Sequence, residues 1–430
     1  MSIPSETLRL HKTSRNHYLS LPSGEECLVT YVFINERGEN LKCKTRTLNH
    51  EPAGIEDIPE WYASMGVNGR RAEVTLVPVR MYRDPFTLDP NKLVLCEVVD
   101  NHHVPTESNK RSQCAQVMEK VKHFEAWFGM EQEYVLFDLD GQLFGWPSGG
   151  CKFPQGSLSC AVGLNKVRGR DICISHYKAC LYAGVKIDGS NAEGLPAQWE
   201  FQVGPCEGTE MSDDLWMARY ILHRVCEDFG VVASLDVKPI KEKKWTSGCH
   251  INFSTKDMRA EGGLQYIEEA VRQLSLRHSE HLLVYDPHGG ADNMRRLTSG
   301  MCTSSFHEFS AGTGSRSVSV RIPGHVNYKN CGYLEDRRPA SNCDPYSVIE
   351  ALVETCLLGT SEEHHDNDKK TVNTPCAVIA NRDEPMFRTE QCMYCSKSGY
   401  KWEDYGDKQA CHHSFYTVEG LCDSDSYSKE

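Results

Sequence analysis

The 430-residue sequence lacks features that would place it in several common classes of protein. No apolar stretch approaches the ~20 residues that a membrane-spanning helix needs, so we expect no membrane partner. The N-terminal region has no cationic segment followed by an apolar one, the pattern of a secretory signal. Acidic residues outnumber basic ones by 60 to 47, and the net charge of -13 argues against nucleic acid as a partner.

The sequence also lacks a G-x-x-x-x-G-K-[ST] segment, so we do not expect a P-loop to hold a nucleotide. Its 20 cysteines are spread along the chain. Without a secretory signal they are expected to be reduced thiols of a cytoplasmic protein. The charged fraction of 25% and the hydrophobic fraction of 39% are typical of a globular protein, and the length suggests two or three domains.

Patterning divides the chain into four segments. The polar residues 1–20 have no periodicity and are expected to form an arm. Residues 21–104 contain short β-rich runs between turn sequences, which predicts a small sheet domain. From 105 to 360 strands alternate irregularly with helices, which favours an α+β domain. Residues 361–430 contain 8 basic and 14 acidic residues and little periodicity, so we expect a mostly disordered acidic tail.

Capping residues mark the ends of helices in the larger domain. Ser, Thr and Asp favour the N-cap because their side chains accept hydrogen bonds from the first backbone amides, and glycine favours the C-terminal stop. We expect helices that begin after Thr106 or Ser108, at Ser212–Asp214 with a stop at Gly230, and at Asp344–Pro345 with a stop at Gly359.

Four segments alternate apolar residues with an unusual set of polar ones. They are Gln198–Val203, His250–Ser254, Ser317–Ile322 and, preceded by Glu131, Glu133–Phe137. Alternate residues of a strand point to one face, so each segment has a face of Glu, His, Asn, Gln, Ser or Arg without lysine. Taken singly, each is also explained by an antiparallel strand with one face in water.

Taken together, the polar faces indicate a metal site. Glu131, Glu133, Glu200 and His250 lie on the predicted strands, and Glu193 lies in a turn. Carboxylate oxygens with one imidazole suit Mg²⁺ or Mn²⁺ better than zinc. Guanidinium groups bind phosphate and carboxylate, and arginines cluster nearby in the sequence at Arg295, Arg296, Arg316, Arg321, Arg337 and Arg338. Carboxylate-bound metal beside arginine is typical of phosphoryl transfer.

From about residue 18 to residue 359 the sequence resembles the eukaryotic-type (type II) glutamine synthetases. The matching motifs are Leu41–Leu48, Pro90–Glu97, Asn191–Gly208, Gly248–His250, Asn252–Thr255 and Glu335–Pro339. The resemblance implies a small N-terminal β-grasp domain, here 21–104, and a barrel-like catalytic domain, here 105–360, with an antiparallel sheet and surrounding helices. It also implies a homo-oligomer, a decamer of two stacked pentamers, with active sites between neighbouring subunits.

The resemblance further implies an ATP-dependent glutamate–ammonia ligase that uses Mg²⁺ or Mn²⁺ and acts through γ-glutamyl phosphate. The residues that match family metal ligands are Glu131, Glu133, Glu193, Glu200, His250 and Glu335. Those that match the nucleotide site are Glu200, Pro205, Asn252, Phe253, Ser254, Arg316, Arg321 and Tyr333. Arg316 and Arg321 match phosphate and substrate contacts, and Arg337 matches the arginine that meets the glutamate carboxylate.

Three departures from the family motifs fall on the glutamate and ammonia side of the site. After Trp61 the family's W-N-[FY]-D-G-S-S-T loop is shortened and lacks its aspartate, and Arg70–Arg71 adds positive charge. In the R-R-L-T-G-F-H-E-T flap, Cys302 stands at the position of the glutamate that helps to form the ammonium site. In N-W-N-G-A-G-C-H, both asparagines are absent, and the chain reads Lys243–Trp245 at the start of that motif.

These departures leave two hypotheses open. One is a working ligase with glutamate and ammonia as substrates. The other is a glutamine synthetase-like pseudoenzyme that binds nucleotide and metal and co-assembles with an active paralogue. Cys302 as a nucleophile would need a placed base, and none is indicated. Cys392, Cys395 and Cys411–His413 have zinc-like spacing, but the second half lacks the usual ligand spacing, so we favour disordered sequence there.

Overall fold

The structure, a computed structural model, describes residues 12–22, 24–67, 70–146, 158–240, 245–298 and 302–359, without the side chains of 12–15, 67 and 70. The chain divides into one unit from Met1 to Ile379 and a second from Ala380 to Glu430. All described residues belong to the first unit. The predicted acidic tail and its zinc-like cysteines lie outside the described residues. No helix in the described part is long and apolar enough to cross a membrane.

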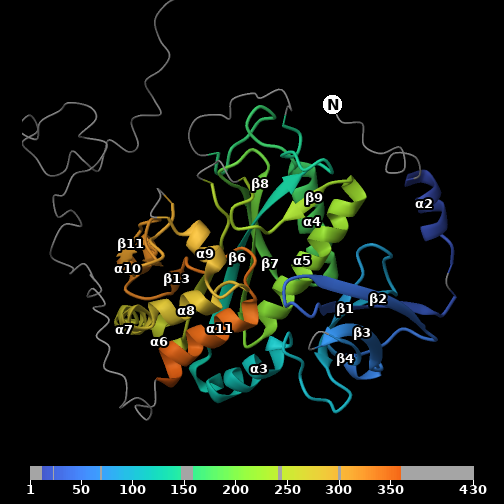
Figure 1. Ribbon diagram of the computed structural model, residues 1–430, viewed down its shortest axis with the longest axis horizontal. Coiled ribbons are helices and arrows are strands. Elements are labelled where there is room, and N and C mark those ends of the chain that lie inside the picture. The colour runs from blue at the N-terminus through green and yellow to red at the C-terminus, as the bar shows by residue number, and fades with distance from the viewer. Residues whose placement is uncertain are drawn as a thin grey trace, which may run out of the picture. The chain divides into compact units, whose positions relative to one another are not determined.

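The N-terminal strands form a five-stranded sheet in the order β2-β1-β5-β4-β3 (Figure 1). Their bounds are β1 Cys27–Ile34, β2 Leu41–Leu48, β3 Trp61–Val67, β4 Arg70–Arg83 and β5 Lys92–Val99. β1 and β5 pair in parallel, and the other pairs are antiparallel. The apolar central strand β1 is buried on both faces. One face, with Val29 and Tyr31, packs in a small core of its own, and the other, with Val32 and Ile34, joins the main core.

A larger sheet forms the frame of the site. It runs in the order β11-β12-β13-β10-β6-β8-β7, and β9 also pairs with β6. The bounds are β6 Trp127–Phe137, β7 Ile187–Ala192, β8 Gln198–Glu207, β9 Val232–Ser234, β10 Cys249–Ser254, β11 Ala311–Thr313, β12 Val320–Ile322 and β13 Leu334–Asp336. Apart from the parallel pair β11–β12, the strands are antiparallel. The curled sheet and its helices confirm the predicted α+β fold.

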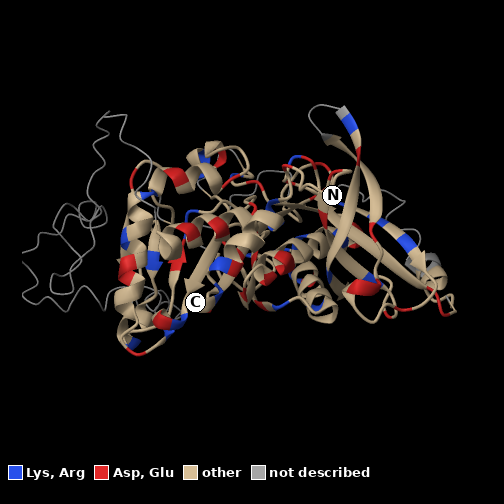
Figure 2. Cartoon of the chain, turned by 90° about the horizontal axis from the view of Figure 1, so that it is seen from below, with Lys and Arg blue, Asp and Glu red and all other residues tan. Residues whose placement is uncertain are grey.

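Helices cover the larger sheet on its core side (Figure 1). The helices of the described chain are α2 Lys12–Leu19, α3 Lys110–Lys120, α4 Arg170–Ala183, α5 Glu210–Phe229, α6 Lys256–Arg259, α7 Leu264–Leu276, α8 His278–Val284, α9 Ala291–Arg296, α10 Gly324–Lys329 and α11 Pro345–Val353, with short 3₁₀ or π turns at Ile55–Asp57, Lys122–Phe124 and Glu354–Leu358. The buried helix α5 contacts β6 and β8, and α4 lies between α5 and β7. Acidic and basic residues are interspersed over these elements (Figure 2).

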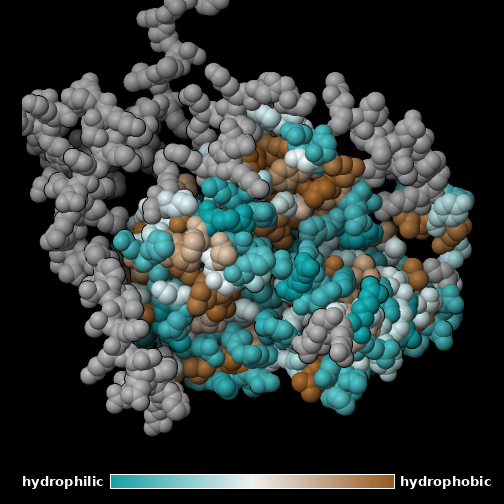
Figure 3. Space-filling view, viewed as in Figure 1, coloured by the Kyte–Doolittle hydropathy of each residue, from teal (hydrophilic) through white to brown (hydrophobic). Residues whose placement is uncertain are grey.

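Exposed apolar side chains are distributed over many elements of the described surface. Ile174 and Leu181, two turns apart on α4, are 53% and 47% exposed. Figure 3 shows the apolar residues of this face as separate patches between hydrophilic ones. Single apolar residues on a surface are ordinary in globular proteins and require no partner.

The predicted helix ends are partly correct. Gly230 ends α5 in a left-handed conformation, Asp344 caps α11 by accepting from the Ser347 amide, and Gly359 follows the last turn. The cap of α3, however, is Asn109, because Thr106 bonds instead to the Val98 carbonyl.

Another helix prediction was wrong in position. α5 begins at Glu210, before the predicted start at Ser212–Asp214. The carboxylates of Asp213 and Asp214 do not cap the helix, because they are buried and accept hydrogen bonds from Arg111 and Tyr82, respectively. The polar N-terminal segment, expected to form an arm, includes the helix α2.

A buried arginine fixes the strand that carries the first two predicted metal ligands. The Gln132 side chain points to the core, opposite those of its neighbours Glu131 and Glu133. Arg219 on α5 donates from Nε to Gln132 Oε1 at 2.8 Å and from its other nitrogens to the Cys343 and Ser341 carbonyls at 2.9 and 3.3 Å. Helix α5 thus fixes β6 from the core side of the sheet.

We predict that Arg219→Met lowers the free energy of unfolding by roughly 2 kcal/mol, because Gln132 Oε1 and the Cys343 carbonyl lose their buried donor at ~1 kcal/mol each, whereas the Ser341 carbonyl still accepts from Gln132 Nε2. Urea denaturation measures this loss. Arg272→Met is the matched control, because Arg272 forms an exposed pair with Glu269 and its loss should change stability by less than ~0.5 kcal/mol. Equal effects of the two substitutions would contradict the proposed role of Arg219.

Candidate metal and nucleotide site

Strand register places five of the six predicted metal ligands on one face of the larger sheet, and the sixth, Glu193, directly follows β7. Glu133 pairs with Glu200 across β6 and β8, and Glu131 pairs with His250 across β6 and β10. Directly paired antiparallel residues share a face. Glu335 joins them from β13 beside Asn252. We call Glu131, Glu133, Glu193, Glu200, His250 and Glu335 the carboxylate face.

Three members of this face converge on one point. His250 Nδ1 lies 3.8 Å from Glu131 Oε2 and 3.5 Å from Glu335 Oε1. One donor atom from each of the three residues lies within 4.8 Å of the others, as a shared metal ion requires. Burial, followed by the charge of Arg337, holds the pKa of His250 well below its usual value, so the imidazole is neutral and can act as a ligand.

The other three carboxyl groups cannot all ionise without a compensating charge. Burial and the neighbouring Glu193 raise the pKa of Glu133 to about 8. Burial raises the pKa of Glu200 well above its usual range, and the charges of Glu131, Glu133 and Glu193 raise it further. The pKa of Glu193 is also raised by burial, although Arg316 opposes this shift. A divalent cation would stabilise the ionised forms, so the donor set fits Mg²⁺ or Mn²⁺.

Hydrogen bonds hold these carboxyl groups in place. Glu133 Oε2 accepts from the Gly248 amide at 3.0 Å and from Gln198 Nε2 at 3.3 Å. Glu193 Oε1 accepts from Asn191 Nδ2 at 2.6 Å, and Glu131 Oε1 accepts from Asn252 Nδ2 at 2.7 Å. Each of these glutamates therefore keeps an oxygen that lacks a neutral amide donor and is available to a cation.

Two of the six predicted arginines bind the Glu335 carboxylate. Arg337 Nη1 donates to Glu335 Oε1 at 2.8 Å, and Arg321 forms an ion pair with the same carboxylate. Arg316 is exposed, and its positive charge acts to lower the pKa of Glu193. Arg321 belongs to a strand that covers only Val320–Ile322, shorter than the predicted Ser317–Ile322, because Ser315 and Ser317 bond to each other in a turn.

Arg296 was predicted only as one arginine of a cluster, and its structural part in the site was not foreseen from the sequence. Its guanidinium is buried and donates to the carbonyls of residues 337, 338 and 339. Burial lowers the pKa of Arg296 to about 10, opposed by the charge of Glu133. A buried arginine that bonds mainly to backbone carbonyls leaves no periodic pattern in a sequence.

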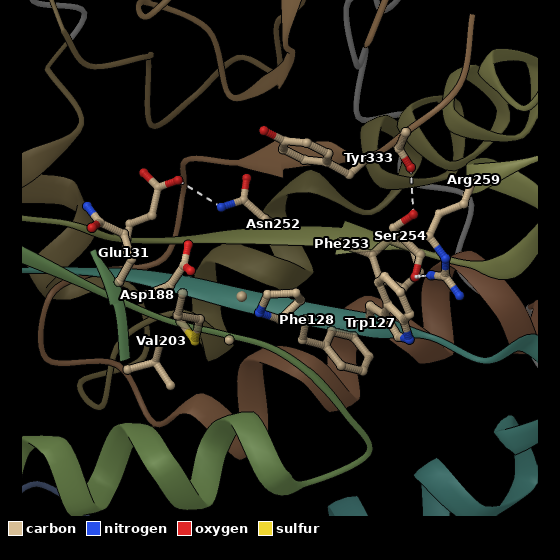
Figure 4. A pocket seen from close by; sticks show the side chains of 16 residues that line it. Trp127, Phe128, Glu131, Asp188, Val203, Asn252, Phe253, Ser254, Arg259 and Tyr333 are labelled. Atoms are coloured by element: carbon tan, nitrogen blue, oxygen red, sulfur yellow. Dashed lines mark hydrogen bonds between the residues drawn. The ribbon is translucent and has the colours of Figure 1, made fainter. Parts of the chain in front are cut away.

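A pocket of about 490 Å³ opens beside the carboxylate face (Figure 4). Of the residues predicted to bind nucleotide, Pro205, Asn252, Phe253, Ser254 and Tyr333 line it together with Glu131. Glu200, Arg316 and Arg321 do not line it. Asn252 Oδ1 is a buried acceptor without a hydrogen-bond partner among the described residues, which leaves it available to a bound molecule.

Two further residues, which the sequence pattern did not indicate, lie at the far end of this pocket. Arg259 stacks over the Trp127 ring at 3.9 Å and donates to the Ser254 carbonyl at 3.2 Å (Figure 4). The two residues are far apart in the sequence and meet because β6 and β10 are neighbours. An aromatic ring stacked with a guanidinium suits the flat face of a base.

The structure describes most of the segments that depart from the family motifs. The segment after Trp61, expected to be a shortened loop, is a hairpin in which β3 pairs with β4 from Trp61–Leu76 to Val67–Arg70. Cys302 is exposed, and its carbonyl accepts from Arg337 Nη2 at 3.3 Å. Lys243 and Lys244 lie outside the described residues.

A second acidic cluster does not resemble a metal site. One donor atom each of Asp286, His288 and Asp292 lies within 4.8 Å of the others. Both oxygens of Asp286, however, accept backbone amides, and Asp292 accepts from Arg295 Nη2 and Asn342 Nδ2. Both oxygens of each aspartate thus already accept hydrogen bonds from the protein, so this cluster needs no metal ion to satisfy its carboxylates.

Comparison with known proteins identifies the family of this site. Residues 108–379 match the family described as "Glutamine synthetase, catalytic domain". The chain is 55% identical to glutamine synthetase of Xenopus laevis over 89% of this chain and 99% of that protein. It is 54% identical to glutamine synthetase of Homo sapiens over 82% of this chain and 96% of that protein. A solved structure titled "Apo GmaS without ligand" shares the fold, with a TM-score of 0.62, 18% identity and 78% coverage of both chains.

The raised pKa of Glu133 predicts how pH acts on the metal-free protein. Because the folded state holds this proton up to about pH 8 and the unfolded state releases it near 4.5, stability should fall as pH rises between those values. The melting temperature of Glu133→Gln should fall less over this interval than that of the unaltered chain. Glu119→Gln, which removes an exposed carboxylate, is the control and should leave the slope unchanged.

The same ionisation should make metal binding depend on pH. Mn²⁺ must displace the Glu133 proton, so its apparent affinity should rise roughly 10-fold or more between about pH 6 and pH 8. Isothermal titration at several pH values measures this rise. An affinity independent of pH would contradict the proposed protonation of the carboxylate face.

Proposed function

Because the chain belongs to the glutamine synthetase family, we propose that it is an ATP-dependent glutamate–ammonia ligase that forms glutamine through γ-glutamyl phosphate. The observation that carries the proposal is the carboxylate face, which directly adjoins the pocket through Glu131. Phosphoryl transfer needs nucleotide and metal held side by side.

In this proposal Glu131, His250 and Glu335 hold one Mg²⁺ or Mn²⁺ ion, and Glu133, Glu193 and Glu200 hold a second. Such ions would offset the negative charge of the phosphates. The proposal rests on the register of β6, β8, β10 and β13 and on the raised pKa values of the buried carboxyl groups.

The chain's other residues divide between the two substrates. The pocket holds the nucleoside part of ATP, with Trp127 and Arg259 against the base and Asn252 and Ser254 near its polar edge. Arg316 and Arg321 face the phosphates, and Arg337 meets the glutamate carboxylate. The contacts of Arg337 with Glu335 and with the Cys302 carbonyl support this assignment, because they place its guanidinium between the carboxylate face and the flap.

Family membership also supports the finer assignments made from sequence. The chain would act in the cytoplasm as a homo-oligomer, a decamer of two stacked pentamers, with a β-grasp domain at 21–104 and a catalytic domain at 105–360. Sedimentation equilibrium measures the oligomeric state.

Two observations favour a second candidate, a nucleotide- and metal-binding protein without ligase activity. Cys302 offers no carboxylate to attract ammonium, and Trp245 replaces a polar residue of the glutamate-binding motif. In that case the chain would act through assembly with an active paralogue. General acid–base groups contribute ~10²–10⁴-fold to a rate, so a missing carboxylate can abolish turnover while ATP still binds.

Ammonia-dependent glutamine formation with ATP and Mg²⁺ separates the candidates. We predict measurable turnover by the unaltered chain and a roughly 10²-fold or greater increase in Cys302→Glu, because a carboxylate restores attraction for ammonium. Cys302→Gln is the matched control for size without charge and should show no increase. Absence of turnover in every variant, with ATP still bound, would support the second candidate.

A further inference from the structure

Trp245 packs against the backbone of Gly194. A Cβ atom built on Gly194 would lie 2.2 Å from Cε3 and 2.3 Å from Cζ3 of the indole ring. The φ angle of Gly194 is not in the left-handed region, so an alanine would suit its backbone. The position needs glycine because the ring occupies the place of a side chain.

Gly194 directly follows Glu193, a member of the carboxylate face. The turn that carries both is tied at its base by Gln198, whose carbonyl accepts from the Glu193 amide at 2.9 Å and whose side chain accepts from the Leu195 amide at 3.1 Å. Between these bonds the backbone of Gly194 is covered by the Trp245 ring. The ring therefore limits how far the Glu193 turn can move.

The chain that carries Trp245 is itself anchored to Glu133. Gln198 Nε2 donates to the Thr246 carbonyl at 3.0 Å and to Ser247 Oγ at 3.2 Å. The Gly248 amide donates to Glu133 Oε2 at 3.0 Å. The residues that follow Trp245 are thus fixed to the same carboxyl group that shares a charge interaction with Glu193.

Trp245 makes this contact through its ring carbons. Among the described residues none accepts a hydrogen bond from its indole nitrogen, and the residue is partly buried against the main core. The family's asparagine at this position belongs to a segment that contacts glutamate, whereas an indole ring packed on a backbone supplies shape and rigidity instead.

We infer that Trp245 is a positioning residue that holds the Glu193 turn against the Glu133 segment, so that both carboxylates face the same divalent cation. The inference rests on the proposed metal-binding role of Glu193. Groups that orient metal ligands typically contribute 10–100-fold to metal affinity, so loss of the ring should be measurable in metal binding alone.

The test is titration with Mn²⁺, with free Mn²⁺ followed by electron paramagnetic resonance. Trp245→Ala should weaken one class of bound ion by roughly 10-fold and leave the ion at Glu131, His250 and Glu335 unchanged. Trp245→Phe, which keeps a ring, should restore most of the affinity. Gly194→Ala should match Trp245→Ala, because its Cβ displaces the ring.

Two controls separate positioning from general destabilisation. Gly324→Ala adds a Cβ where no heavy atom lies within 4 Å and should bind Mn²⁺ as the unaltered chain does. In a double-mutant cycle, Trp245→Ala should have no further effect on Mn²⁺ binding once Glu193→Gln is present, because Trp245 acts through Glu193.

Three outcomes would overturn the inference. They are unchanged affinity in Trp245→Ala, equal weakening of both ions with a lower melting temperature, and additive effects of Trp245→Ala and Glu193→Gln. If the unaltered chain bound no Mn²⁺, the proposed metal site would itself be wrong, and the inference would fall with it. The unaltered chain therefore distinguishes the two kinds of failure.

Discussion

The need to place five carboxyl groups beside one imidazole on a single sheet face governs this structure. Such a face is costly when metal-free, because burial and mutual repulsion raise the pKa values of Glu133, Glu193 and Glu200. Arg321 and Arg337 pair directly with Glu335, whereas arginine charge only partly opposes the raised pKa values of Glu133 and Glu193. A cation bound at the rest of the face would stabilise the ionised carboxylates, so the arrangement that destabilises the metal-free protein would also create the affinity for divalent metal that we propose.

The sheet tolerates this charge because polar contacts on its reverse face hold the strands. Gln132, between the two glutamates of β6, is bound by Arg219. Asp336, next to Glu335, pairs with Arg338, which holds the pKa of Asp336 below its usual value although burial acts to raise it. β6 and β13 thus each present a proposed ligand on one side and a buried anchor on the other. Variation at the flap and at Trp245 can then alter the substrate side without disturbing the strands.

The sequence predicted the carboxylate face better than its surroundings. Period-two alternation revealed β6, β8 and β10, because polar residues on alternate positions of a strand must share a face. It could not reveal Arg259 against Trp127, or Arg296 among backbone carbonyls, since these contacts depend on which strands and helices become neighbours. The acidic residues at the start of α5 were misinterpreted as a helix cap for the same reason. Their hydrogen-bond partners, Tyr82 and Arg111, lie on β4 of the N-terminal sheet and on α3.

The proposed metal sites are tested most directly with crystals grown with Mn²⁺ and a non-hydrolysable ATP analogue, in which anomalous diffraction locates the metal. We predict one anomalous peak among Glu131, His250 and Glu335 and another beside Glu133, Glu193 and Glu200, with the base of the nucleotide in the pocket at Trp127. Peaks elsewhere, or a carboxylate face that stays empty of metal while the nucleotide is bound, would contradict the central claim.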